Sequence, residues 1–440
     1  MAIIAQKQLF GWNEIEGLGD LERLRLVAEH MPDEELMRAL ESRRARGRDD
    51  YPVRAVWNSI LAGVVFGHES VESLRRELLR NAQLRQVCGF EVTRGAAAVP
   101  SRFAYTRFLR SLMDHDDMIE GIFASLVEEL SGLLDGFGVR LACDGKAVRS
   151  HGRRRRTGAA SEADGRRDLD ADVGVKRYRG TREDGSVWEK ITKWFGYKLH
   201  LVVDSHWELP VAFEVTKASA GEQPVAHRLL DALDVRHPAL LERCEYFSAD
   251  KGYDTGSLSR RLWDTHQVRP VIDIRNLWDK DEPSRPLGDS LDLVHDHRGA
   301  VYCCCPRTGR QRPMVYGGFE ADRETLKYLC PARHHKRPCP GANDCSVGHS
   351  VRVPISPDKR TFPPLPRATM SWQREYSRRT AVERVNSRLD VSFGLERHYI
   401  RGLAKMRLRC GLALIVMLAM ALGRVRHNQH ERLRSLVQAA

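Results

Sequence analysis

The chain has 440 residues, of which 71 are Lys or Arg and 59 are Asp or Glu, so its formal net charge is +12. Hydrophobic residues make up 42% of it, which fits a folded protein with a full hydrophobic core and excludes a disordered one. The longest apolar run, at 412–422 (LALIVMLAMAL), is shorter than the roughly 18 residues of a membrane span, so we expect a buried core helix and no membrane partner. The N-terminal residues lack the basic stretch and cleavage site of a secretory signal, so we expect a cytoplasmic protein.

The excess positive charge lies mainly in two segments. Residues 145–200 have a net charge of +7, from 15 basic and 8 acidic side chains, and residues 366–440 have a net charge of +10, from 15 and 5. Lys and Arg side chains that bind phosphates release counterions, so this segregation favours a nucleic-acid partner. An arginine-rich protein with solvated helix faces is the alternative that charge alone leaves open.

The first 130 residues carry apolar side chains at helical spacing. In the segment 53–65, for example, Val56, Ile60 and Val64 fall on one face of a helix. We predict an all-helical N-terminal domain over 1–130 that serves DNA binding and assembly. A plain helical bundle is the alternative.

From residue 138 onward, short apolar runs alternate with helical patterns, which is typical of an α/β sheet. The runs expected to form strands lie at 139–144, 197–204, 209–216, 245–250 and 268–274, and helical patterns occupy 221–235 and 257–266. A short turn between the second and third runs favours a hairpin, and the later strands return through right-handed crossovers. We therefore predict a mixed five-stranded sheet with flanking helices.

Two segments interrupt this pattern. Residues 150–190 are hydrophilic and include the run HGRRRRTG, so we expect a mobile surface loop that is able to order on a DNA backbone. Residues 277–366 are rich in Pro, Gly and Cys, and we interpret them as an insertion. The predicted domains are a helical domain at 1–130, a core split into 138–276 and 367–423 by the insertion at 277–366, and a basic tail at 424–440.

Two carboxylates stand at the ends of predicted strands. Asp144 ends the run at 139–144, and Asp250 ends the run at 245–250. Neighbouring strands lie about 4.8 Å apart, so two such carboxylates are able to share a hard divalent cation. A charged residue that ends a strand in solvent is the alternative.

A third acid, Glu383, lies on the helix expected at 372–389. Tyr376 and Arg379 precede it by seven and four residues, so the three side chains share one helix face. An apolar stripe beside them predicts that this face lies near the strand ends, where a carboxylate needs a partner or a metal. A surface ion pair between Arg379 and Glu383, worth about a few tenths of a kcal/mol, is the alternative.

Four motifs make the sequence recognisable. They are ACDGKAVR at 142–149, FGYKLHLVVD at 195–204, SADKGYD at 248–254 and the Tyr376-x2-Arg379-x3-Glu383 spacing. Together they resemble the DDE transposases of bacterial insertion sequences, in the group that carries a Tyr-x2-Arg-x3-Glu-x6-Lys element. The segment that begins YPVRAVWNSI at residue 51 resembles the helical domain that precedes the catalytic core in that family. The resemblance covers roughly residues 50–420.

The resemblance implies a ribonuclease-H-like fold and a catalytic triad, Asp144, Asp250 and Glu383, that binds Mg²⁺ or Mn²⁺. It also implies that Tyr376 and Arg379 orient Glu383 and contact the DNA end.

The sequence departs from the family at one position. The Lys that the family carries seven residues after the Glu falls on Asp390, and Arg388 and Arg397 are the candidates to replace it. Lys146 and Lys251, each close in sequence to one of the two Asp residues, are further side chains that we expect to bind DNA, together with Arg388.

The resemblance also implies a function. Two metal ions roughly 3.5–4 Å apart would support nicking at the ends of the element and attack of the freed 3′-hydroxyl on target DNA. Two ends must be brought together, so a homodimer on DNA is expected, in the bacterial cytoplasm. A catalytically silent DNA-binding protein derived from a transposase and a ribonuclease-H-like repair nuclease are the alternatives. Tyr376 as a covalent nucleophile is a weaker one, because the three carboxylates argue against it.

Six of the ten cysteines fall between 303 and 345, and in a cytoplasmic protein such a cluster indicates a metal before disulfides. Four thiolates are able to form a tetrahedral structural zinc site. No C-x2-C pair occurs, and reduced thiols without a metal are the alternative. The ligands we expect are Cys305 (or Cys303), Cys330, Cys339 and Cys345.

Overall fold

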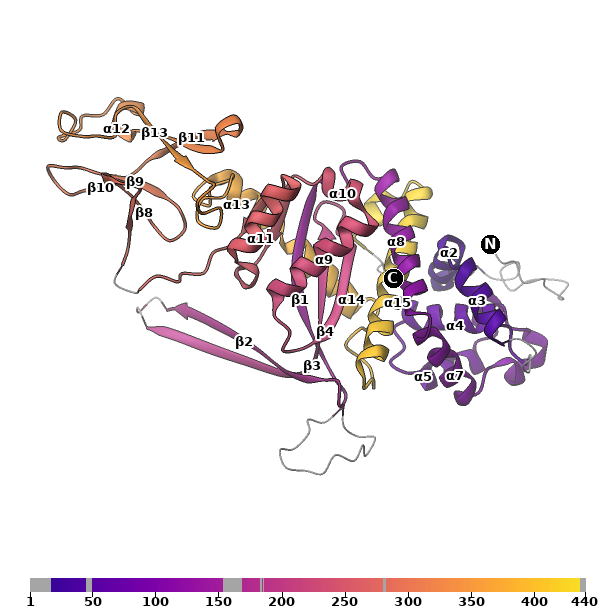
Figure 1. Ribbon diagram of the computed structural model, residues 1–440. Helices are drawn as coiled ribbons and strands as arrows, with labels where there is room; N and C mark the ends of the chain where they lie inside the picture. Colours follow the sequence, from indigo (N-terminus) through magenta and orange to yellow (C-terminus); the bar gives the residue numbers. More distant parts are fainter. Residues whose placement is uncertain are drawn as a thin grey trace.

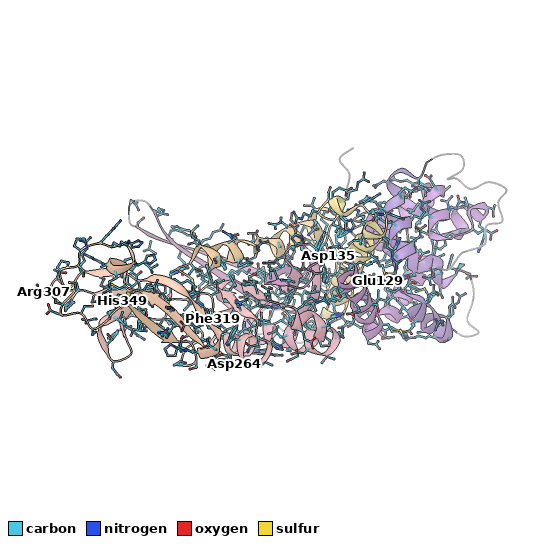
Figure 2. The ribbon with its side chains drawn as sticks, turned by 90° about the horizontal axis from the view of Figure 1, so that it is seen from above. Glu129, Asp135, Asp264, Arg307, Phe319 and His349 are labelled. Atoms are coloured by element: carbon cyan, nitrogen blue, oxygen red, sulfur yellow. The ribbon has the colours of Figure 1, made fainter. Side chains whose placement is uncertain are left out.

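The computed structural model describes residues 17–44, 50–152, 168–182, 184, 186–279 and 282–435. The arginine-rich part of the predicted loop, at 153–167, lies outside the described residues. The molecule is elongated, with N-terminal helices at one end, an α/β core in the middle and a β-rich region at the other end (Figure 1). In the view from above, Glu129 and Asp135 lie toward the helical end and Arg307 and His349 toward the opposite tip (Figure 2).

Among the described residues, seven α-helices precede the sheet, so the predicted helical character of the N-terminal region is confirmed. They are α2 (Glu22–His30), α3 (Glu34–Arg44), α4 (Val53–Val65), α5 (Val71–Arg80), α6 (Ala82–Cys88), α7 (Arg102–Met113) and α8 (Asp116–Leu133). Local sequence explains where they begin. Before α5, the Ser70 hydroxyl accepts the N–H of Ser73, and the Ser73 side chain caps the N–H of Ser70 in return.

The core is a mixed sheet. Its strands are β1 (Arg140–Arg149), β2 (Asp172–Thr181), β3 (Val187–Asp204), β4 (Leu209–Lys217), β5 (Tyr246–Ala249) and β6 (Arg269–Ile272). They lie in the order β2-β3-β1-β5-β6, and β4 also pairs with β3. β3 is antiparallel to β1, β2 and β4, whereas β1, β5 and β6 run parallel. The predicted hairpin and the predicted crossovers are both present, so the α/β class is confirmed.

The sheet has six strands rather than the predicted five, because the segment expected to be a loop contains β2 and the beginning of β3, at 187–190. These two strands form a long hairpin that projects from the core (Figure 1). Glycines on β2 lie directly beneath tryptophans on β3: Gly174 faces Trp194 and Gly180 faces Trp188. Hydrophilic composition concealed these cross-strand pairs, which stabilise the hairpin.

Helices cover both faces of the sheet. On one side lie α9 (Glu222–Arg236), α10 (Pro238–Glu242) and α11 (Gly256–Arg260), and on the other side lie α13 (Met370–Ser377) and α14 (Thr380–Val391). Successive residues of a strand point to opposite faces. Gly145 faces the side chain of Glu222 on α9, whereas Asp144 faces Arg379 at the start of α14.

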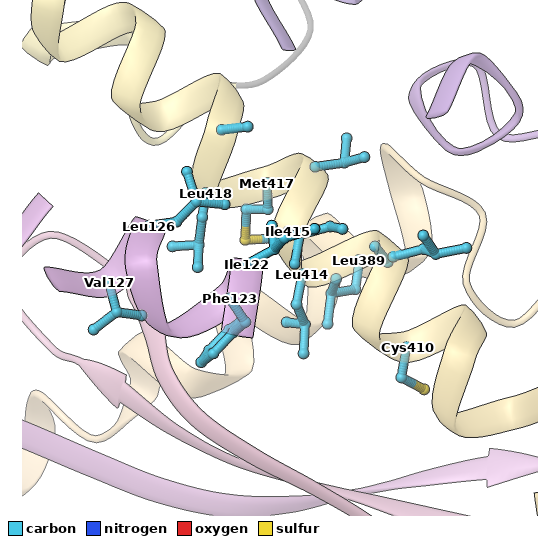
Figure 3. Packing of buried hydrophobic residues seen from close by; sticks show 14 of the residues in the cluster. Ile122, Phe123, Leu126, Val127, Leu389, Cys410, Leu414, Ile415, Met417 and Leu418 are labelled. Carbon is cyan, nitrogen blue, oxygen red and sulfur yellow. The ribbon is translucent and has the colours of Figure 1, made fainter. Parts of the chain in front are cut away.

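Helix α15 (Leu403–Arg426) contains the apolar run at 412–422 and is buried, as predicted. It packs against α8, α2, α4 and strand β4, so one hydrophobic core extends from the N-terminal helices to the sheet. Side chains of α8 and α15 interlock in Figure 3, where Ile122, Phe123 and Leu126 lie beside Leu414, Ile415 and Leu418. By length and composition alone α15 could cross a membrane, but 94% of its apolar window is buried inside the protein.

The residues interpreted as an insertion form two small sheets. The first consists of β7 (Arg285–Leu287), β8 (Ser290–His295), β9 (Val301–Cys304) and β10 (Gln311–Pro313), and the second of β11 (Val315–Glu320), β12 (Thr325–Leu329) and β13 (Ser350–Pro354). A short helix, α12 (Pro331–His334), follows β12. Both sheets share a small hydrophobic cluster that includes Trp263 of the core.

Candidate active site

Asp144 and Asp250 occupy equivalent positions on two neighbouring strands. β1 and β5 are parallel, and the residues directly before the two acids, Cys143 and Ala249, are paired in register. Asp250 follows the last residue of β5, as predicted, and its Oδ1 accepts the N–H of Gly252 at 2.8 Å. The adjacent register therefore brings the two carboxylates to one region of the sheet.

Asp144 differs from the prediction in one respect. It lies within β1, because the strand continues past Gly145 to Arg149 and stays paired with β3 throughout. The expectation that Asp144 ends the strand is wrong. The pairing shows the reason: beyond Asp144, β1 stays in register with the middle of β3, as far as Arg149 opposite Gly196.

The surroundings of Asp144 disfavour its charged form. Burial, reinforced by the negative charge of Asp250, raises the pKa of Asp144 to about 6, although Lys176, Arg379 and a hydrogen bond from the Gly145 N–H act in the opposite direction. That hydrogen bond is 2.7 Å long. Two acids at the same buried place are stabilised when a cation joins them.

Glu383 lies on the same side of the sheet, and Arg379 connects it to Asp144. The guanidinium of Arg379 donates to Glu383 Oε1 at 2.8 Å and approaches Asp144 Oδ2 at 3.5 Å. The Glu383 side chain is 54% exposed. The third predicted acid therefore faces the first, with one positive charge between them.

The donor chemistry fits a hard divalent cation, because all three acids offer carboxylate oxygens. Within the described ranges, no three His, Cys, Asp or Glu side chains surround one point closely enough to hold an ion as they stand. Arg379 explains this for the three acids, since its guanidinium lies between Asp144 and Glu383. The space between Asp144 and Glu383 already holds the positive charge of Arg379, which supports the fit of a cation to these carboxylates.

The ring of Tyr376 contacts both Trp372 and Arg379. Its ring lies 4.6 Å from the ring of Trp372, and the Arg379 guanidinium lies 5.7 Å from its centroid. Burial raises the pKa of Tyr376, so its hydroxyl stays neutral. The residue supports Arg379, and the neutral hydroxyl is a poor nucleophile.

Lys146 and Asp390 form an ion pair across the sheet and α14. Lys146 Nζ lies 2.6 Å from Asp390 Oδ2 and 2.8 Å from Glu396 Oε1. At the position where the family carries a Lys, this chain therefore has an acid that binds a Lys from β1. DNA contact by Lys146 stays a prediction, as does contact by Lys251, which is exposed beside Asp250.

The prediction that Arg388 binds DNA is wrong, because its side chain is buried on the other face of α14. Arg388 donates to the backbone oxygen of Glu208 at 2.6 Å and to that of Leu433 at 3.0 Å. The Glu208 carboxylate is also buried and pairs with Arg388 at 3.2 Å. Arg388 therefore neutralises a carboxylate in the β3–β4 turn.

The structure adds one acid that sequence reasoning missed, Glu222, the first residue of α9. A Cβ atom on Gly252 would collide with Glu222 Oε2 and lie 2.8 Å from Asp250 Oδ1, so both carboxylates border the same space. Lys198 Nζ lies 3.6 Å from Glu222 Oε1. An acid in the first turn of a helix is ordinary, so nothing in the local sequence distinguished it.

The neighbouring Gln223 braces the loop that carries Asp250. Its side-chain amide donates to the backbone oxygen of Gly252 at 3.3 Å. His200 borders the same place from β3: burial lowers its pKa to about 3, and its Nδ1 has no hydrogen-bond partner among the described residues. The start of α9 thus supports the Asp250 loop from the face opposite to α14.

Comparison with known families agrees with this arrangement. A family model described as a transposase DDE domain matches residues 136–419, and a model described as a transposase domain matches residues 14–111. The first match spans more than half of the chain and contains all three predicted acids, so the chain belongs to the DDE transposase family. A search of curated proteins found no match.

Proposed function

We propose that the protein is an active DNA transposase that cleaves the ends of an insertion sequence and joins them to target DNA by metal-dependent phosphoryl transfer. The observation that carries the proposal is that Asp144 and Asp250 directly follow paired residues of two adjacent parallel strands, with Glu383 facing Asp144 across Arg379. The family match supports transposition as the purpose of this chemistry.

The proposed fold is ribonuclease-H-like. An antiparallel β4-β3-β1 arrangement continues into the parallel strands β5 and β6, with Asp144 on β1 and Asp250 directly after the neighbouring strand β5. The strand order supports the proposal because it places the two acids side by side.

Asp144, Asp250 and Glu383 are the residues that would hold Mg²⁺ or Mn²⁺. Bound divalent ions would activate a water or hydroxyl nucleophile and stabilise the leaving oxygen at a scissile phosphate. The chain supplies the rest: β1 and β5 fix the two Asp carboxylates, α14 presents Glu383, and Tyr376 holds Arg379 by ring contact. We infer that Arg379 binds a DNA phosphate once the carboxylates have another cation.

The proposed partners are the ends of the element and the target DNA, bound by a homodimer in the cytoplasm. The net charge of +12 supports a polyanionic partner. Lys251, exposed next to Asp250, is the side chain we propose to contact a phosphate close to the scissile one.

The experiment uses the purified protein and labelled duplexes that carry the inverted repeats flanking its gene, a scrambled duplex, and a branched duplex. With Mg²⁺, the proposal expects nicks at the repeat ends that leave 3′-hydroxyls, and joining of those ends to a plasmid. Binding to the repeats without any cleavage would indicate the silent DNA-binding protein. Cleavage of the branched duplex without regard to the repeats would indicate the repair nuclease.

A further inference from the structure

The β-rich region contains six cysteines that no contact described above explains. They are Cys303, Cys304, Cys305, Cys330, Cys339 and Cys345, and each is a free thiol in the structure, which describes all ten cysteines of the chain. Most of them are only partly buried. Partly exposed reduced thiols are prone to oxidation, so we expect a cluster of six to have a specific chemical role.

The region has a small hydrophobic core. Ten buried hydrophobic side chains form its cluster, and one of these, Trp263, belongs to the core domain. The segment 335–349, which carries Cys339 and Cys345, contains no helix or strand. Two small sheets with so little apolar burial gain much from a covalent or metal cross-link.

All six cysteines border one small cavity of about 30 Å³. They come from both sheets: three follow one another at the end of β9, Cys330 immediately follows β12, and the remaining two lie in the irregular segment. A cavity of this volume has room for a single water or ion.

The three consecutive cysteines differ in what surrounds them. Side chains alternate along β9, so the Cys304 thiol points away from its neighbours and has Gln311 and Asp292 close by. The Cys303 thiol lies near those of Cys330, Cys339 and Cys345.

Cys305 borders the cavity but is not placed among the other three thiols. A Cβ atom on Gly341 would lie 2.9 Å from the Cys305 sulfur, so the irregular segment passes directly over this thiol. Of the two candidates for the fourth ligand, the arrangement favours Cys303 over Cys305.

We propose that Cys303, Cys330, Cys339 and Cys345 bind one structural Zn²⁺, which joins the two small sheets and orders the segment between Cys339 and Cys345. Four thiolates match the tetrahedral preference of zinc. Each thiol loses its proton on binding. Arg310 and Arg312 border the cavity and offset the negative charge of four thiolates on one divalent ion.

The thiols border the cavity without yet converging on one point, so binding draws the irregular segment inward. Some hydrogen bonds join this segment to the rest of the region, including the one from Arg307 to Asp344, and others are local. Cys330 donates to the backbone oxygen of His349 at 3.0 Å, and Ser346 donates to Asp292 Oδ2 at 2.9 Å, whereas the turn at Cys339 is held by the local bond from Ala342.

The test measures zinc in the full-length protein purified under reducing conditions without added metal, together with single Cys→Ser variants. The proposal expects about one zinc per chain in the unchanged protein and less than about 0.3 in the Cys303→Ser, Cys330→Ser, Cys339→Ser and Cys345→Ser variants. Cys304→Ser is the matched control and keeps its zinc, as does Cys305→Ser. Loss of zinc from Cys305→Ser but not from Cys303→Ser would overturn the ligand set.

A second measurement does not depend on how the variants fold. Co²⁺ added to the unchanged protein after zinc is removed should give the visible bands of tetrahedral cobalt with thiolate charge transfer. Absence of both zinc and these bands overturns the proposal, as does a non-reducing peptide map in which the four cysteines are linked by disulfides. Neither readout involves DNA, so the proposal stands or fails separately from transposition.

Discussion

At the scale of single residues, the protein changes the acidity of Asp144. Its carboxyl is buried, it lies close to Asp250, and its pKa is raised to about 6. Because the folded value exceeds the unfolded one, the folded state is favoured while Asp144 is protonated. This stabilisation is present below about pH 4 and is lost as the pH rises to about 6.

We therefore expect Asp144→Asn to stabilise the protein at pH 7.5 in EDTA, by about 1–3 kcal/mol, because it removes a buried charge. At pH 4 the variant and the unchanged protein should differ little, since Asp144 is then protonated. Thermal unfolding at both pH values measures this. Asp322→Asn, whose side chain is 79% exposed, is the control and should have no effect. A lower unfolding temperature for Asp144→Asn at pH 7.5 contradicts the assignment.

Glu222 allows a second test at this scale. Its carboxylate borders the same space as that of Asp250, so Glu222→Gln should weaken Mn²⁺ binding about 10-fold, as measured by electron paramagnetic resonance. DNA cleavage should then require more Mg²⁺. Glu214→Gln, which breaks the surface pair with Arg228, is the matched control. Unchanged Mn²⁺ affinity in Glu222→Gln would leave Glu222 with only its contact to Lys198.

The sequence alone predicts the role of a residue when the residue belongs to a motif with fixed spacing. It predicts less when the role depends on which side chains become buried together. Asp144, Asp250 and Glu383 could be chosen in advance: Asp144 and Asp250 follow paired residues of β1 and β5, and Arg379 links Glu383 of α14 to Asp144. For Arg388, the sequence could not distinguish a buried ion pair from a DNA contact, because the carboxylate that it neutralises lies 180 residues earlier in the chain. Glu222 was missed for the same reason: its neighbours on β1, β3 and β5 come together only in the folded chain.

At the scale of elements, the β2–β3 hairpin shows how composition misleads. Charged residues and glycines concealed an alternation in which Trp194 covers Gly174 and Trp188 covers Gly180. The other strands were predictable, because their apolar runs are continuous and buried.

The hairpin gives an element-scale prediction. A methyl group on Gly174 would collide with Trp194, which is only 5% exposed and has little room to move, so Gly174→Ala should destabilise the protein by about 1–3 kcal/mol. Gly180→Ala is the matched control, because Trp188 is less buried and is able to shift. Thermal unfolding distinguishes the two variants. Equal unfolding temperatures for Gly174→Ala and the unchanged protein would contradict the observed pairing.

At the scale of the molecule, the N-terminal helices are part of the same core as the sheet. Helix α15 is covered by α8, α2 and α4 on one side and by β4 on another. Removing residues 1–133 would therefore expose a long apolar surface on α15, and we expect the remaining chain to be insoluble or aggregated. Size-exclusion chromatography of the truncated and full-length chains tests this. A soluble, monodisperse 134–440 fragment would contradict the shared core.

The central claim is that Asp144, Asp250 and Glu383 act together in cutting DNA. The most direct measurement is strand cleavage of a duplex carrying the end of the element, in Mg²⁺, by the unchanged protein and by Glu383→Gln, with Glu431→Gln as a control on an exposed acid. We predict that Glu383→Gln retains binding to the end but cleaves at below about 1% of the unchanged rate, while the control cleaves normally. Cleavage by Glu383→Gln at the unchanged rate would contradict the claim.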